Sequence, residues 1–186
     1  MIDKWRKYWR ITRADEIARR YFINNSFDGV LTTIGLLMGM FLAGVANTQI
    51  IITTSLSTGI AIGLSGFWGA FLTEVAERKK KLMELEKSLM RNLKDTEIER
   101  ASSFASKIVA LVDGLSPLLS TIIVILPFFF ISTIDAYYLA FTIAGLMLVG
   151  LGIFLGRVSK ENQILLGLKM LAAGILAIGI SYLLLN

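Results

Sequence analysis

The chain has 186 residues, a formal net charge of +5 and a mean hydropathy of +0.68, and 55% of its residues are hydrophobic. This composition is typical of an integral membrane protein. Cysteine and histidine are both absent, which excludes disulfides and metal sites built from thiolate or imidazole ligands. The sequence also lacks a nucleophile–base set and a phosphate-binding loop. We therefore expect no enzymatic activity.

Residues 1–26 are rich in basic and aromatic side chains. Trp5 and Trp9 are four residues apart and share one face of a helix, whereas the cations spread over the rest of its surface. This pattern predicts an amphipathic cytoplasmic or interfacial segment, which either lies among lipid headgroups or packs on the domain. Membrane lipid is thus an expected partner, and nucleic acid is not.

Five apolar stretches follow, and each is long enough to cross a bilayer core, which takes about 20 helical residues. The sequence therefore predicts an all-α integral membrane protein, with a five-helix transmembrane domain over 27–186. The expected spans are 28–45, 50–74, 102–130, 136–156 and 163–185.

A charged segment, 75–101, separates the second and third spans. Its leucines recur at three- and four-residue steps, which predicts an amphipathic helix or a helical hairpin outside the membrane. Carboxylates and methionines of this segment and of the preceding helix end are candidate metal ligands, although a solvated helix face would show the same pattern. These candidates are Glu74, Glu77, Met83, Glu84, Glu86 and Met90.

The distribution of positive charge predicts the orientation. All 19 Lys and Arg residues lie within 4–20, 78–107 or 157–169, and the two opposite turns contain none. The positive-inside rule therefore predicts a cytoplasmic N-terminus, cytoplasmic segments 1–26, 75–104 and 157–162, and a C-terminus on the opposite side.

Asp28 stands at the start of an uncharged run that extends to residue 73. A carboxylate at the edge of such a run is costly unless it faces water or a bundle interior, so Asp28 is a candidate functional residue. A structural alternative is that Asp28 caps the helix N-terminus. Asp28, Thr32, Gly35 and Gly39 share one helix face. That face is either the wall of a pathway or a site of tight helix packing.

Further candidates lie on the second and third spans. Ser65 and Asp113 are polar residues that could line a transport pathway, whereas Gly59, Gly63 and Gly66 form a stripe of small residues suited to helix packing. Asp28-Gly29 recurs as Asp113-Gly114, which is either a weak internal repeat or a coincidence.

Several of these motifs resemble the vacuolar iron transporter family. Residues 25–33 (NSFDGVLTT) are similar to the opening of its first helix, and residues 63–70 (GLSGFWGA) to its second. The Leu-Pro element at 125–128 and residues 167–174 are similar to its third and closing helices. The resemblance covers about residues 20–185.

The resemblance implies a homodimer of five-helix subunits that exports Fe²⁺, and often Mn²⁺, from the cytoplasm in exchange for protons, with the metal as substrate. It places Asp28 at the family's first-helix metal and proton site. The chain differs from the family in lacking a helix-2 methionine, near Ile62, and in its shorter charged segment. Two alternatives stay open: a transporter-like protein for a different substrate, and a non-transporting scaffold or lipid-binding protein.

Overall fold

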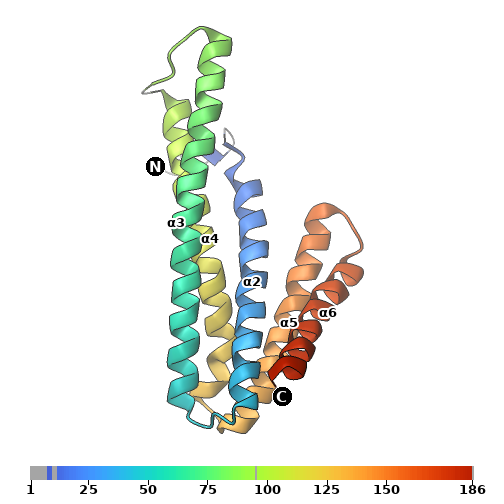
Figure 1. Cartoon of the computed structure of the whole chain (residues 1–186). Coiled ribbons are helices and arrows are strands. Elements are labelled where there is room, and N and C mark those ends of the chain that lie inside the picture. The colour runs from blue at the N-terminus through green and yellow to red at the C-terminus, as the bar shows by residue number, and fades with distance from the viewer. Residues whose placement is uncertain (1–7, 10–11, 95, 186) are drawn as a thin grey trace. The chain divides into compact units, whose positions relative to one another are not determined.

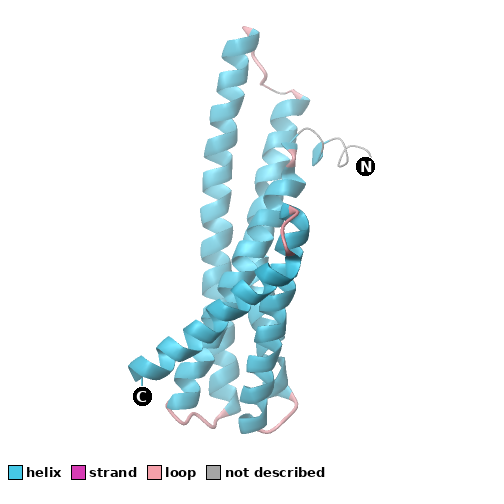
Figure 2. Ribbon diagram, turned by 90° about the vertical axis from the view of Figure 1, so that its right-hand side faces the viewer, coloured by secondary structure: helices cyan, strands magenta, loops and turns pink. Residues whose placement is uncertain are grey.

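A computed structural model describes residues 8–9, 12–94 and 96–185 of the chain (Figure 1). The predicted amphipathic segment includes Trp5 and the cations within 1–7, and these residues lie outside the described ranges. The described residues form helices joined by short turns, with no strand among them, as Figure 2 shows. The predicted all-α fold is therefore confirmed.

The described residues include five long helices and one short 3₁₀ helix. The five long helices are each long and apolar enough to cross a membrane, so the protein is a multi-pass membrane protein. The elements are α2 (Ala14–Leu42), α3 (Thr48–Leu89), α4 (Glu97–Ile125), η1 (Leu126–Phe129), α5 (Thr133–Ser159) and α6 (Gln163–Leu185).

The first two spans are longer than the expected 28–45 and 50–74. Helix α2 begins at Ala14 and includes the second half of the basic segment. Helix α3 continues through the charged residues after Glu74 to Leu89, because no glycine or proline follows Gly69 within it. Of the two forms expected for 75–101, the structure has the hairpin, which turns between Leu89 and Glu97.

The third span changes character at its end. We expected one helix over 102–130, but α4 ends at Ile125 and a 3₁₀ turn carries the chain to Phe129. Pro127 lies in the first turn of this 3₁₀ helix. Its ring lacks the N–H that an α-helical hydrogen bond would need, and the chain adopts 3₁₀ geometry at this point.

Local chemistry explains where the helices end. Met90 (φ 48°) and Lys160 (φ 59°) adopt the left-handed conformation directly after α3 and α5, and Gly44 (φ 67°) adopts it two residues after the end of α2. The side chains of Asn47 and Asn162 then accept backbone N–H groups from the first turns of α3 and α6. Both are standard devices for satisfying the free backbone groups of helix ends.

The chain forms two compact units, and helices α2, α3 and α4 contribute a part to each. The first unit contains residues 1–22 and 63–115, and the second contains 23–62 and 116–186. The second holds an apolar core in which Ile34 and Leu37 of α2, Ile51 of α3 and Leu148 of α5 are fully or almost fully buried. Within this unit α5 packs along α6 (Figure 1).

Candidate functional site

Asp28 lies in the interior of α2 and its side chain is exposed. The helix begins fourteen residues earlier, at Ala14. The alternative that Asp28 caps a helix N-terminus is therefore wrong. Asp28 is instead a carboxylate on the side of a helix, followed only by uncharged residues up to the end of α2.

The helix face that carries Asp28 is open. Thr32, one turn further along α2, is also exposed. A Cβ added at Gly35 would have no described atom within 4 Å, and one added at Gly39 would meet only Leu185 Cδ1, at 3.9 Å. Within one chain, these two glycines therefore do not mediate the tight packing that was one of their expected roles.

Another face of α2 is packed closely against α4 of the same unit. A Cβ added at Gly29 would lie 2.6 Å from the Cα of Pro117, so the two backbones touch at this position. One turn further on, the hydroxyl of Thr33 lies 2.7 Å from the carbonyl oxygen of Gly29, to which it donates, and 3.0 Å from the hydroxyl of Thr121. Thr33 is buried, so this polar contact ties α2 to α4 inside the unit.

Helix α3 joins the same contact through Gly59. A Cβ added there would lie 3.2 Å from the side chain of Thr121, so Gly59 has the packing role expected of it. Nearby in sequence, the hydroxyl of Ser55 is buried and has no hydrogen-bond partner among the described residues. The sequence did not single out Thr33, Ser55 or Thr121, because hydroxylated residues are common along both helices and their spacing does not indicate which helices meet.

In the first unit, Asp113 is buried where α3 and α4 cross. It is 5% exposed, and a Cβ added at Gly66 would lie 2.9 Å from its Oδ2 atom. A Cβ at Gly114 would lie 2.7 Å from the carbonyl oxygen of Gly63. The small-residue stripe thus packs against the second Asp-Gly pair. Ser65, on the same stretch of α3, is exposed.

Glu74 forms an ion pair within α3. Its Oε2 atom lies 3.1 Å from Nε of Arg78, and the two side chains are 12% and 11% exposed. The i, i+4 spacing of the two residues is a sequence signal for this pair. The carboxylate of Glu74 is therefore already paired with Arg78 of the same helix and is not a free metal ligand.

The other candidate metal ligands at the end of α3 are dispersed. Glu77, Glu84, Met83 and Met90 are exposed, and Glu86 accepts a hydrogen bond of 2.7 Å from the N–H of Leu93. Across the described part of the chain, no group of three or more acidic side chains is arranged to hold a metal ion.

Two comparisons place the chain among known proteins. Residues 88–186 match the profile of the VIT family. An uncharacterized protein of Methanocaldococcus jannaschii is 36% identical over 168 residues, which cover 89% of this chain and 86% of that protein. The family match spans more than half of the chain, and the relative extends the similarity over nearly all of it. The chain therefore belongs to the VIT family, a family of membrane metal-ion transporters.

Proposed function

We propose that the protein exports a divalent metal ion, Fe²⁺ or Mn²⁺, from the cytoplasm in exchange for protons, and that it does so as a homodimer. The metal ion is the transported substrate. Carboxylate and hydroxyl oxygens suit both ions, and Asp28 and Thr32 supply these groups on one face of α2.

The exposure of Asp28 carries this proposal. Asp28 lies eight residues beyond Arg20, the last preceding charge, which corresponds to about 12 Å along the helix. An ionised carboxylate at such a depth is costly against lipid and requires water or a protein partner. Because the rest of the unit leaves this side chain exposed, the requirement is met if the face lines an aqueous pathway.

The open glycines on the same face support the homodimer. Small residues allow two helices to approach closely in lipid, where packing replaces the hydrophobic effect. Gly35 has no described neighbour within 4 Å of an added Cβ. The same face of a second subunit, meeting it across a twofold axis, would cover this surface. Such a pairing would bring two Asp28 carboxylates to one pathway.

The Asp28 carboxylate would also carry the proton that is exchanged for the metal ion. A carboxylate holds either a proton or part of a metal ion's coordination shell, so metal entry would release the proton and metal exit would allow its return. The chain has no histidine, and a carboxylate is a side chain that can bind both a proton and a divalent cation.

The proposal is tested by metal uptake into proteoliposomes that contain the purified full-length protein. Fe²⁺ or Mn²⁺ should accumulate, and an imposed pH gradient should change the rate in the direction of antiport. Protein that retains its fold but gives no uptake of either ion beyond empty vesicles would refute metal transport. Uptake that is insensitive to the gradient would refute proton exchange alone.

A further inference from the structure

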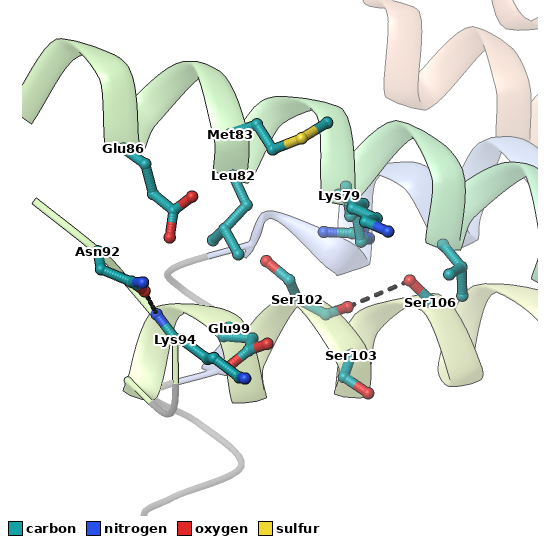
Figure 3. Close-up of a pocket in the computed structure, with 12 residues that line it drawn as sticks. Lys79, Leu82, Met83, Glu86, Asn92, Lys94, Glu99, Ser102, Ser103 and Ser106 are labelled. Atoms are coloured by element: carbon teal, nitrogen blue, oxygen red, sulfur yellow. Dashed lines mark hydrogen bonds between the residues drawn. The ribbon is translucent and has the colours of Figure 1, made fainter.

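The first unit contains a pocket of about 420 Å³ between the end of α3 and the start of α4 (Figure 3). It lies outside the uncharged run and contains none of the residues of the Asp28 face. Three cations and three hydroxyls contribute to its lining: Arg78, Lys79, Lys94, Ser102, Ser103 and Ser106.

Arg78 is the least satisfied polar side chain of this pocket. Its Nε lies 3.1 Å from Glu74, but its Nη2 atom is buried and has no hydrogen-bond partner among the described residues. Buried polar atoms are almost always paired, and a guanidinium N–H left without an acceptor is costly. Arg78, which lines the pocket, therefore holds a donor whose missing partner is an acceptor, best an anionic one.

The lining carries charges of both signs. Three cationic side chains accompany two carboxylates, Glu86 and Glu99. The carboxylate of Glu86 already accepts the N–H of Leu93. In Figure 3, Glu86 lies beside Asn92, away from the end of the pocket that holds Lys79 and Ser106. That end holds the ammonium group of Lys79, a donor suited to phosphate oxygens, whereas the Ser106 hydroxyl there already donates to the carbonyl oxygen of Ser102.

The location of the pocket along α3 points to the membrane surface. Arg78 comes four residues after Glu74, the first charge beyond the uncharged run, or about 6 Å along the helix. Val75, Leu82 and Met83 add an apolar side to the lining. A phosphate group attached to an apolar body would match both parts of the pocket.

We propose that this pocket binds a phosphate group, with Arg78 Nη2 as its central donor and Lys79, Lys94 and the serines around it. The phosphate belongs either to an anionic phospholipid headgroup or to a soluble phosphate compound. The inference does not depend on which ion the protein transports.

The test uses the full-length protein without metal. Retention of phosphatidylglycerol is measured by native mass spectrometry, and thermal stabilisation is measured in detergent on addition of inorganic phosphate. Arg78→Lys keeps the charge and a partner for Glu74 but removes Nη2, and it should weaken binding about tenfold, the effect of losing one hydrogen bond to a charged group. Lys94→Gln, at an exposed position, should weaken binding without disturbing the fold.

Lys169→Gln is the matched control, because Lys169 is an exposed lysine of α6 outside the pocket. Preferential retention of phosphatidylglycerol over phosphatidylcholine would identify a headgroup, whereas stabilisation by inorganic phosphate would identify a soluble ligand. Binding of neither probe would overturn the proposal. So would equal losses in Lys94→Gln and Lys169→Gln, which would indicate a general effect of charge.

Discussion

The two Asp-Gly pairs of this chain differ in how their aspartates are placed. Both glycines lie against a neighbouring helix: Gly29 against Pro117, and Gly114 against Gly63 and Phe67. Asp28, however, is exposed, whereas Asp113 is buried. The shared element is therefore the close helix contact at glycine. The carboxylates beside it have different surroundings.

Replacement of Gly29 by alanine should be strongly destabilising. The new Cβ would lie 2.6 Å from Pro117 Cα and 2.8 Å from its carbonyl oxygen, and backbone atoms cannot move aside as a flexible side chain would. We expect a loss of about 1–3 kcal/mol, the usual cost of overpacking. Thermal unfolding of the purified protein in detergent measures it.

Gly69→Ala, in α3 and away from the α2 face that the proposed homodimer would cover, is the control for this substitution. It adds the same methyl group to a helix, but at a position with no described neighbour within 4 Å. Its melting temperature should stay unchanged or rise slightly, because alanine favours a helix more than glycine does. Equal melting temperatures for the two variants would contradict the contact between Gly29 and Pro117.

At the scale of the elements, the turn after α3 is held by Glu86 and strained at Met90. The N–H groups of Met90 and Arg91 donate to the carbonyl oxygens of Lys87 and Glu86, as in a Schellman motif, which usually has glycine at the left-handed position. Met90 occupies that position with φ 48°. The Glu86 carboxylate accepts the N–H of Leu93 and closes the turn.

Met90→Gly should therefore stabilise the hairpin by up to about 1 kcal/mol, because the left-handed conformation costs a non-glycine residue roughly that much. Glu86→Gln keeps an acceptor for Leu93 and should be nearly neutral, whereas Glu86→Ala should open the turn. Hydrogen exchange at the Leu93 amide reports each change. Faster exchange in Met90→Gly, or equal exchange in Glu86→Gln and Glu86→Ala, would contradict this description.

The sequence predicted five spans because long uncharged stretches are a strong signal. It did not predict where the helices end, since helical structure does not stop at the membrane boundary: α2 begins before its apolar part and α3 continues after it. The sequence also did not predict that Asp113 is buried and that Asp28 is exposed. Apolar residues cover both the inward and the lipid-facing sides of a membrane helix, so the sequence pattern of α2 and α4 does not separate the two.

At the scale of the whole molecule, the orientation is a prediction from the charge distribution. Ala46 lies in the turn between α2 and α3, and Ser88 lies near the end of α3. Both are exposed, and the chain has no cysteine of its own. Single cysteines at these positions should react with an impermeant maleimide from opposite sides of the membrane, with residue 88 on the cytoplasmic side. Labelling of both from one side would contradict the topology.

The proposed homodimer predicts a specific cross-link. A cysteine at Gly35 should form an intersubunit disulfide under mild oxidation, because its face would meet the same face of the second subunit. Gly179→Cys on α6 is the control, since Gly179 also has no described neighbour within 4 Å of an added Cβ. A disulfide at 179 but not at 35 would place the subunit interface elsewhere.

The central claim is that Asp28 carries both the metal ion and the proton, and Asp28→Asn tests it most directly. The amide keeps the size and shape of the side chain but neither balances a divalent charge nor exchanges a proton near neutral pH.

Asp135→Asn is the control. Asp135 is an exposed aspartate in the first turn of α5 that accepts a hydrogen bond from Ser132, and asparagine can still accept it. In proteoliposomes, the Asp28→Asn protein should take up no more Mn²⁺ or Fe²⁺ than protein-free vesicles, and the Asp135→Asn protein should match the unmodified rate. Folded Asp28→Asn protein that transports metal at the unmodified rate would contradict the claim.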